Sequence, residues 1–405
     1  MAFSRRMDSF GEEIFAALNE RKLALEQSGR KLWNLSVGTP DFPPSEAVRE
    51  ALREAAADPE SWKYTLRDTP EMLSAVCDYY ARRYGVSITP DEVCSCPGSQ
   101  EGMGHLGLLL CDEGDTVLLP EPCYPAFLAG ARMAGAVPVF YPLCERNHWL
   151  PDPDDIPEDA ARRARYMIVS LPSNPTGSVG TDECYRRLIA FARRWGIVLI
   201  HDNAYSDIVF DGREGGSFLR YEGAREAGAE FFSLSKSFNL TGARISFLVG
   251  RKDLVAGFRR LRTQYDFGMF LPIQKAAVEA LKTPRAALRE QCARYQARRD
   301  ALCDGLTAIG WPVRRSEGSM FVWAPIPEGW RGSTMDFCLA LMERSGVICT
   351  PGESFYGSAG ARGDRGHVRF ALVLPPEEIR EAVASIAACG LVQTGLPGDF
   401  HCDRA

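Results

Sequence analysis

Apolar runs and stretches of helical periodicity alternate along the middle of the chain. Short apolar runs predict strands at 92–96, 115–119, 136–140, 166–171, 196–200, 230–234 and 244–249. Between them, apolar residues recur at helical spacing over 99–111, 125–134 and 182–195. Strands that alternate with helices in this way predict an α/β fold, with helices packed on a mostly parallel sheet.

The helix expected over 182–195 has the clearest end signals. Thr181 suits the N-cap, Asp182 and Glu183 fall in the first turn, and Gly196 follows the last turn. Its apolar face is formed by Tyr185, Leu188, Ile189, Ala192 and Trp195.

The two ends of the chain have a different pattern. Helices are expected at 12–27, after Ser45 and at 70–85, and residues 253–300 read as helical with two breaks. A small α+β domain is expected from residue 312, with elements at 320–323, 335–345, 347–349, 367–373 and 376–388. We therefore expect three parts: a large domain over 46–285, a small domain formed by 1–45 together with 286–395, and a C-terminal tail over 396–405.

The composition narrows the class of protein. A length of 405 residues suits two or three domains, or one large and one small, and 45% hydrophobic with 25% charged residues is typical of a globular chain. No apolar run approaches the roughly 18 residues that a membrane span needs. The net charge of −6 disfavours nucleic acid or an anionic membrane as the main partner. Residues 1–30 contain no apolar secretory stretch, so we expect a cytoplasmic protein.

The thirteen cysteines do not follow a metal-ligand pattern. Cys94 and Cys96 form a C-x-C pair, but no second close pair lies near them in the sequence. We expect reduced thiols in the core and no metal site.

Three polar motifs each follow a predicted strand, at 173–177, 201–205 and 233–237. In open α/β sheets, ligands bind beyond the carboxyl ends of the strands. Asp202 follows an apolar run, and a carboxylate at the edge of a dry core requires a positive partner. Lys236, with Arg244 eight residues further on, is expected to have a lowered pKa and to act as a nucleophilic amine.

Together these motifs resemble a known family. Asn-Pro-Thr-Gly at 174–177, Asp202-x-x-Tyr205 and the stretch Ser233-x-Ser-Lys236-Ser-x-Asn-x-Thr-Gly-x-Arg244 are similar to the fold-type I aminotransferases of class I/II, which use pyridoxal phosphate. The resemblance runs from about Gly38 to Arg369. It implies a three-layer α/β/α large domain with a smaller α+β domain. It also implies ping-pong transfer of an amino group between an L-amino acid and a 2-oxo acid.

The resemblance gives each motif residue a role toward this cofactor. Lys236 would hold the cofactor aldehyde as a Schiff base, and Asp202 would pair with the pyridine nitrogen. Asn174 and Tyr205 would donate hydrogen bonds to the phenolic oxygen. The phosphate would be held by Ser233, Ser235 and Arg244.

A helix N-terminus is expected to supply the remaining phosphate ligands, because its free N–H groups and dipole favour an anion. The segment 97–102 lies between a predicted strand and a predicted helix. The backbone amides of Gln100 and Glu101 and the Ser99 hydroxyl are the candidates. Tyr124 matches the aromatic residue that stacks on the cofactor ring in the family.

Further positions match the family's substrate and interface residues. Arg369 would hold the substrate's α-carboxylate, and Gly38 would lie where the N-terminal segment closes over the substrate. Tyr64 matches the tyrosine that reaches the phosphate of a neighbouring subunit, which implies a homodimer with shared active sites. Thr69 and Ser74 depart from the family pattern after Tyr64. The segment 265–268 is a further interface candidate, and a dicarboxylate preference is unsupported although Arg262 is close.

Other functions remain possible beside transamination. The same residues could serve a pyridoxal-phosphate lyase or cyclase, since the cofactor carries the chemistry, or a regulator without activity. The alanine and LL-diaminopimelate aminotransferase branches are most similar over 202–212 and 232–250. The glycines at 102, 104 and 107 match the G-x-G-x-x-G pattern of a dinucleotide-binding turn. They lie inside a predicted helix and not in the turn before it, so we do not expect a dinucleotide site. His201 is expected to be structural.

Overall fold

The computed structural model describes residues 3–10, 16–357 and 366–392. The predicted tail over 396–405 and the start of the helix expected at 12–27 lie outside the described residues. The chain forms two compact units. The first contains residues 1–10, 39–293 and 317–319, and the second contains 11–38, 294–316 and 320–405.

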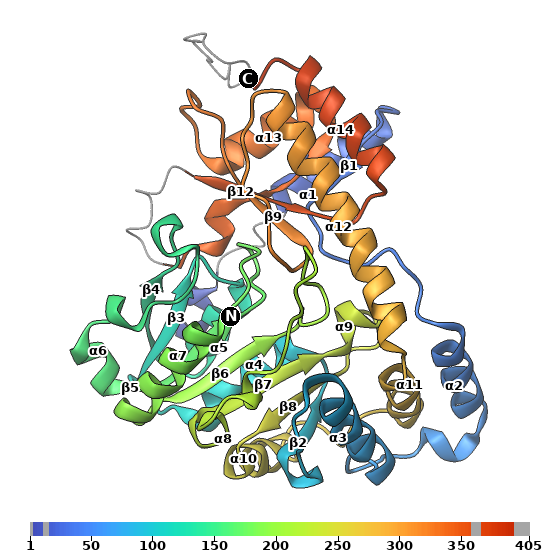
Figure 1. Cartoon of the computed structure of the whole chain (residues 1–405), viewed down its shortest axis with the longest axis vertical. Helices are drawn as coiled ribbons and strands as arrows, with labels where there is room; N and C mark the ends of the chain where they lie inside the picture. The colour runs from blue at the N-terminus through green and yellow to red at the C-terminus, as the bar shows by residue number, and fades with distance from the viewer. Residues whose placement is uncertain (1–2, 11–15, 358–365, 393–405) are drawn as a thin grey trace. The chain divides into compact units, whose positions relative to one another are not determined.

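Within the described residues, a seven-stranded sheet forms the centre of the first unit (Figure 1). Its strands are β2 (Val93–Cys96), β3 (Thr116–Glu121), β4 (Val137–Pro142), β5 (Ala164–Ser170), β6 (Val198–Asn203), β7 (Gly228–Ser233) and β8 (Ser246–Gly250). They lie in the order β2-β8-β7-β6-β5-β3-β4. Strand β8 is antiparallel to β2 and β7, and the other neighbouring strands are parallel. The mostly parallel sheet expected from the sequence is confirmed.

The α-helices of the first unit precede, separate and follow these strands. They are α2 (Glu46–Ala57), α3 (Pro70–Tyr84), α4 (Ser99–Leu110), α5 (Pro125–Met133), α6 (Glu158–Arg163), α7 (Asp182–Trp195), α8 (Ala224–Ala227), α9 (Leu234–Ser237), α10 (Lys252–Arg262) and α11 (Leu271–Leu281). The end signals of α7 act as expected. Thr181 Oγ1 accepts a hydrogen bond from the Cys184 amide at 3.1 Å, and Gly196 ends the helix at a φ of +69°.

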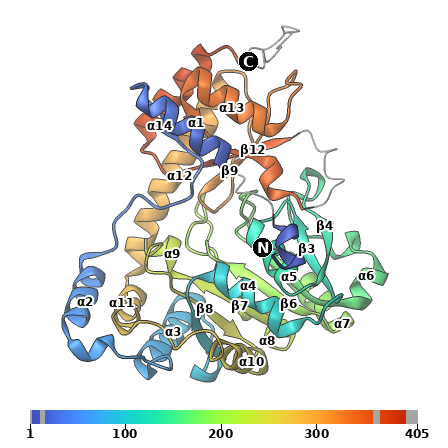
Figure 2. The same cartoon turned by 180° about the vertical axis from the view of Figure 1, so that it is seen from behind.

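Helices cover both faces of the sheet (Figures 1 and 2). On one face, apolar side chains of α4, α5 and α10 form a buried cluster that includes Phe231 of β7. The next residue, Phe232, points to the opposite face because side chains alternate along a strand. There it stacks on Tyr79 of α3 at a centroid distance of 5.2 Å. The three-layer α/β/α order is therefore confirmed.

The second unit contains smaller sheets and several helices. A three-stranded antiparallel sheet has the order β11-β12-β9, and a parallel pair joins β1 to β10. The strands are β1 (Trp33–Asn34), β9 (Phe321–Pro325), β10 (Val347–Ile348), β11 (Thr350–Pro351) and β12 (His367–Ala371). The helices are α1 (Ala16–Gln27), α13 (Thr334–Ser345) and α14 (Pro376–Ala388). Helix α12 (Arg285–Ala308) begins in the first unit and continues into the second.

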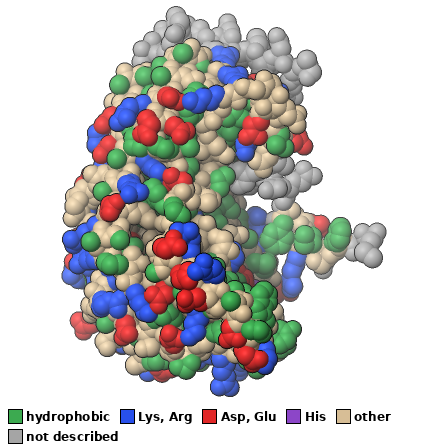
Figure 3. Space-filling view, turned by 90° about the vertical axis from the view of Figure 1, so that its right-hand side faces the viewer, with side chains coloured by type: hydrophobic (Ala, Val, Ile, Leu, Met, Phe, Trp, Pro, Cys, Tyr) green, Lys and Arg blue, Asp and Glu red, His purple; other side chains and the backbone are tan. Residues whose placement is uncertain are grey.

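The surface mixes charges of both signs. On the face drawn in Figure 3, acidic and basic side chains are interspersed, and hydrophobic side chains gather at the lower right of the view. Among the described residues, none of the helices combines the length and apolar character that crossing a bilayer requires.

Candidate active site

The connection between β7 and β8 brings several motif residues to one edge of the sheet. Ser233 at the end of β7 pairs with Ser246 at the start of β8, and Ser246 pairs with Cys96 at the end of β2. Because β8 runs back against β7, this connection leaves and re-enters the sheet at the carboxyl edge of the parallel strands. It carries both Lys236 and Arg244. The edge is therefore the place where an open α/β sheet binds its ligand.

Asp202 is a buried carboxylate near the end of β6, and among the described residues only one of its oxygens has a hydrogen-bond partner. Ser170 Oγ, at the end of the neighbouring strand β5, donates to Asp202 Oδ2 at 3.3 Å. Asp202 Oδ1 is buried and finds no hydrogen-bond partner among the described residues. Burial raises the pKa of this carboxyl to about 6, and the charge of His201 and the Ser170 hydrogen bond lower it in part. Such an oxygen fits a cationic N–H donor.

Lys236 lies on the one-turn helix α9, and its charge interacts with the Asp202 carboxylate. The Ser233 side chain caps α9 by accepting a hydrogen bond from the Ser235 amide at 3.2 Å. The charge of Lys236 lowers the pKa of Asp202, so the two groups sense each other across the edge of the sheet. Ser233 and Ser235 are buried, and Lys236 is partly buried.

An anion cradle lies where α4 begins. Gly98, the N-cap residue, has a φ of +91°, and a Cβ built on it would lie 2.1 Å from Arg244 Nη2. The guanidinium therefore packs directly on the backbone at the start of the helix. Ser99 Oγ is buried without a hydrogen-bond partner among the described residues. Free amides, a helix dipole, a hydroxyl and a guanidinium together suit a phosphate.

Gln100, Glu101 and Tyr124 lie around the same helix start. Gln100 and Glu101 occupy the first turn of α4, where backbone amides lack helical acceptors. The Tyr124 hydroxyl donates to Gln100 Oε1 at 2.7 Å, so the phenol ring is held beside this turn. Burial raises the pKa of the Glu101 carboxyl.

Asn174 and Tyr205 follow the adjacent strands β5 and β6. Both side chains are buried, at 5% exposure each, beyond the carboxyl ends of those strands. A buried amide and a buried phenol are able to donate hydrogen bonds to a ligand oxygen in a dry site.

His201 has a different environment from Asp202. Its Nδ1 lies 3.1 Å from Glu230 Oε2, and its Nε2 lies 2.8 Å from the Leu171 carbonyl oxygen. Both ring nitrogens contact internal groups on the face covered by α7, where the Tyr185 ring meets the imidazole edge-on. This geometry fits the structural role expected for His201.

Tyr64 lies on an exposed segment that packs against residues 265–270. The Leu66 amide donates to the Phe267 carbonyl at 3.0 Å, and the Tyr64 and Phe267 rings lie 5.0 Å apart. Tyr64 is 78% exposed in this single chain. Its side chain is thus presented to solvent together with Phe267.

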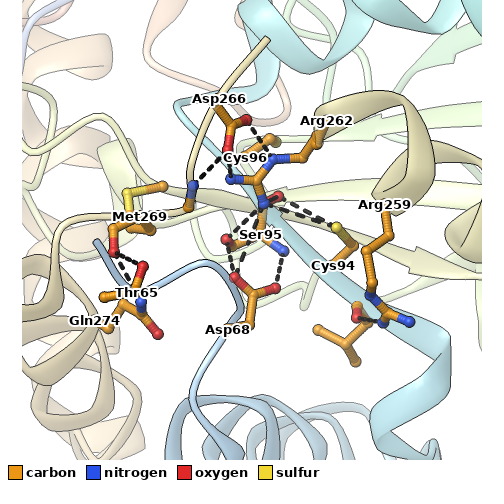
Figure 4. A network of polar contacts seen from close by, with 12 residues as sticks. Thr65, Asp68, Cys94, Ser95, Cys96, Arg259, Arg262, Asp266, Met269 and Gln274 are labelled. Carbon is orange, nitrogen blue, oxygen red and sulfur yellow. Dashed lines mark hydrogen bonds and ion pairs between the residues drawn. The ribbon is translucent and has the colours of Figure 1, made fainter. Parts of the chain in front are cut away.

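Arg262 is committed to internal partners, as Figure 4 shows. Its guanidinium donates to both carboxylate oxygens of Asp266, at 2.8 and 3.0 Å, and to Ser95 Oγ at 3.1 Å. Asp68 Oδ1 lies 3.9 Å from Arg262 Nη1, and Asp68 also accepts from the Ser95 amide at 2.8 Å. This buried network joins the segments around residues 68 and 266 to β2. Its geometry gives Arg262 no role as the binder of a distal substrate carboxylate.

Arg369 and Gly38 come together within the second unit. Arg369 Nη2 donates to the Ser36 carbonyl at 2.9 Å, and its guanidinium lies over the Phe321 ring, 4.1 Å from the centroid. A Cβ on Gly38 would lie 2.5 Å from Phe321 Cζ, so only glycine fits against this ring. Phe321 is therefore shared by both predicted substrate residues.

Sequence reasoning gave no role to Ser170, Gly98 or Phe321. Ser170 ends a buried strand, and nothing in its own segment shows that a neighbouring strand places Asp202 beside it. Gly98 stands within the 97–102 segment, but its contact with Arg244 depends on the β2–β8 pairing. Phe321 had the pattern of an ordinary strand residue.

The site residues fit the cofactor that the resemblance implies. The unpartnered oxygen of Asp202 suits a protonated ring nitrogen, and the cradle of Gly98, Ser99 and Arg244 suits a phosphate. Lys236 supplies an amine at the same edge of the sheet.

Comparisons with known proteins agree with these features. The family described as aminotransferase class I and II matches residues 30–386. An LL-diaminopimelate aminotransferase of Desulforudis audaxviator is 37% identical over 388 residues, which cover 95% of this chain and 97% of the relative. Another, from Halothermothrix orenii, is 37% identical and covers 93% and 96%. The substrate-bound structure of BacF from Bacillus subtilis aligns with a TM-score of 0.91 at 33% identity, covering 96% and 98%. A probable N-succinyldiaminopimelate aminotransferase from Thermus thermophilus aligns with a TM-score of 0.87 at 36% identity, covering 93% and 100%.

Proposed function

The chain belongs to aminotransferase class I and II, and we propose that Lys236, Asp202 and the start of α4 form its cofactor site. The enzyme is a pyridoxal-phosphate-dependent transaminase of fold type I, which moves an amino group between an amino acid and a 2-oxo acid in a ping-pong reaction.

The observation that carries the assignment is the environment of Asp202. A buried carboxyl with one unpartnered oxygen is costly in the protein alone, and burial has already raised its pKa to about 6. A cationic ring N–H beside Asp202 would offset this cost and keep the carboxylate ionised. A phosphorylated aldehyde needs two further attachments. Lys236 supplies an amine for the aldehyde, and the anion cradle of Gly98, Ser99 and Arg244 supplies a site for the phosphate.

Bound pyridoxal phosphate supplies an electron sink for the charge left when the substrate's α-carbon loses a proton. The chain's residues hold the group and move that proton. Arg244, Ser99 and the α4 amides would hold the phosphate end, and Asp202 would hold the ring nitrogen. Asn174 and Tyr205 would donate to the phenolic oxygen. The Nζ of Lys236 would take the proton from the substrate's α-carbon and return it to complete the transfer.

The substrate is recognised through its α-carboxylate. Arg369 suits this role because a guanidinium binds a carboxylate through two parallel hydrogen bonds. Its stacking over Phe321 and its bond to the Ser36 carbonyl hold the side chain in one orientation. We take LL-diaminopimelate as the first amino donor to test, because several relatives are named for it. Arg262 is not assigned to the distal carboxylate of this dicarboxylate donor.

A second copy of the chain completes the site. Large hydrophobic side chains are exposed together on the segments 62–66 and 267–270, and an exposed apolar patch of this kind marks an interface. They are Trp62, Tyr64, Leu66, Phe267 and Phe270. In the homodimer, Tyr64 contacts the phosphate held by the partner subunit.

The test is the half-reaction of a lysine variant. Lys236→Ala is expected to keep its fold but to lose the visible absorption of bound cofactor and the conversion of LL-diaminopimelate to the 2-oxo acid. Lys282→Ala removes an exposed lysine that pairs with Glu279 and serves as the matched control. Substantial amino transfer by Lys236→Ala would overturn the assignment. Ammonia released without an amino acceptor would identify elimination instead.

A further inference from the structure

The turn that carries Lys236 is short, so its last carbonyl groups cannot be satisfied by helical hydrogen bonds of its own. Helix α9 has four residues, and the last carbonyls of any helix have no partner within it. The chain leaves α9 through Asn239, which has a φ of +58°. A single turn of this kind does not hold a catalytic side chain in place without contacts from elsewhere.

Gln291 of α12 supplies those contacts. Its Nε2 donates to the carbonyl oxygen of Lys236 at 3.1 Å and to that of Ser237 at 3.2 Å. Its Oε1 accepts from Asn239 Nδ2 at 2.8 Å. All three contacts therefore end on residues 236–239. The orientation of the amide is also determined, because the reversed amide would place its oxygen against two carbonyl oxygens.

The start of α12 is fixed in the same unit by contacts on either side of Gln291. Arg289 pairs with Glu214 at 2.8 Å, and Leu288 is buried. Cys292 Sγ donates to the Val209 carbonyl at 3.1 Å. The Gln291 amide thus projects from a firmly attached helix toward the lysine turn.

We propose that Gln291 is a positioning residue for Lys236. It holds the peptide units at 236 and 237, and through them it sets the origin and direction of the lysine side chain. This inference rests on the proposed function, because it takes Lys236 to be the residue that holds the cofactor and moves the α-proton. Proton transfer requires close alignment, and a misplacement of about 1 Å costs on the order of 100-fold in rate.

Two nearly isosteric variants separate hydrogen bonding from packing. Gln291→Leu removes every polar contact. Gln291→Glu keeps an oxygen toward Asn239 but replaces the donor that faces the two carbonyls. The matched control is Cys292→Ala, which removes a neighbouring side-chain contact to a backbone carbonyl outside the lysine turn.

We expect kcat to fall by about 10- to 100-fold in both Gln291 variants, while KM for the amino donor changes less than about threefold. In the protein without cofactor, amide hydrogen exchange over 234–240 is expected to accelerate by about tenfold or more. Cys292→Ala should change neither quantity, although its melting temperature is expected to fall as in Gln291→Leu.

A kcat within about twofold of the parent enzyme in folded Gln291→Leu or Gln291→Glu would overturn the inference. Unchanged exchange over 234–240 would overturn it as well, and this readout does not depend on cofactor or activity. If borohydride reduction attaches the cofactor to a lysine other than Lys236, the proposed function fails instead. The two failures are therefore distinguishable.

Discussion

At the residue scale, the site depends on polar groups whose burial is matched to a ligand. Asp202 and Ser99 each present a buried oxygen with no hydrogen-bond partner in the described part of the chain. Each such atom costs free energy in the protein alone. A ligand that forms hydrogen bonds with both oxygens removes this cost when it binds. The unsatisfied oxygens therefore increase the affinity for the cofactor.

Asp202→Asn tests this exchange through the stability of the cofactor-free protein. The folded pKa of Asp202, about 6, lies above its usual value of 3.8. Between about pH 4 and pH 6, Asp202 is protonated in the folded state but ionised in the unfolded state. The parent protein therefore loses stability as the pH rises through this range. At about 1.4 kcal/mol per pKa unit, we expect the variant to be more stable than the parent by about 3 kcal/mol at pH 8 and about half that at pH 5.

Urea unfolding of both cofactor-free proteins at the two pH values measures this difference. The same variant should bind pyridoxal phosphate less tightly, because the ring nitrogen loses its ionised partner. Equal stabilities of the two proteins at pH 8 would show that the Asp202 carboxyl is not strained by burial.

The lysine and aspartate were predictable because each lies in a short motif at the end of an apolar run. The roles of Ser170 and Gln291 could not be predicted in this way. Strand pairing brings Ser170 beside Asp202, and Gln291 lies on a helix that is 55 residues from Lys236 in the sequence. Polar residues of this kind have no distinguishing signal in their own segment.

At the scale of elements, strand direction builds the phosphate cradle. Because β8 is antiparallel to its neighbours, Arg244 returns to the edge where β2 ends and α4 begins. The alternation of strands and helices predicted the sheet but not the reversal of β8. The reversal depends on how the connection after Lys236 folds back, which the periodicity of apolar residues does not encode.

Gly98→Ala tests the close approach of Arg244 to α4. The variant adds both backbone strain at a positive φ and a Cβ in the position of the guanidinium. Gly114→Ala is the matched control, because Gly114 has a φ of +88° with no atom within 4 Å of its Cβ position. Both variants are expected to lose about 1 kcal/mol or more of unfolding free energy.

Only Gly98→Ala is expected to lose cofactor affinity, by about tenfold or more, since a displaced charged hydrogen bond costs at least about 1.4 kcal/mol. Titration of the cofactor-free proteins with pyridoxal phosphate measures this affinity. A similar loss in Gly114→Ala would assign the effect to backbone strain alone.

The buried network around Arg262 connects three segments of the first unit (Figure 4). Arg262→Met would leave the nearly buried carboxylate of Asp68 and the partly buried carboxylate of Asp266 without their cation. We expect a loss of about 3–5 kcal/mol in unfolding free energy. Arg260→Met, on the exposed side of the same helix, should change stability by less than about 0.5 kcal/mol. Denaturant unfolding compares the two, and equal small losses would show that the network contributes little.

At the scale of the whole molecule, each active site is proposed to take residues from two chains. The exposed aromatic residues around Tyr64 and Phe267 are costly to leave in water, and this cost favours our proposal that a second chain covers them. The motifs and composition predicted a family and a two-domain chain. The surface that a partner covers could not be read from periodicity, because exposed aromatic residues interrupt an otherwise polar segment without a repeating pattern.

Mixing two inactive variants tests the shared site. Lys236→Ala lacks the catalytic amine and Tyr64→Ala lacks the residue given to the partner. In a mixed dimer one site regains both, so after subunit exchange we expect about a quarter of the parent activity, from half of the dimers with one good site each. Activity that stays at the sum of the separate variants, in a sample shown by light scattering to contain mixed dimers, would place Tyr64 outside the partner's site.

The most direct measurement of the central claim is the identity of the residue that bonds the cofactor. The holoenzyme is reduced with borohydride and digested, and the modified peptide is sequenced by mass spectrometry. We expect the reduced cofactor on Lys236 and on no other of the seven lysines. A cofactor attached to a different lysine, or no attachment after saturation with pyridoxal phosphate, would contradict the assignment of the site.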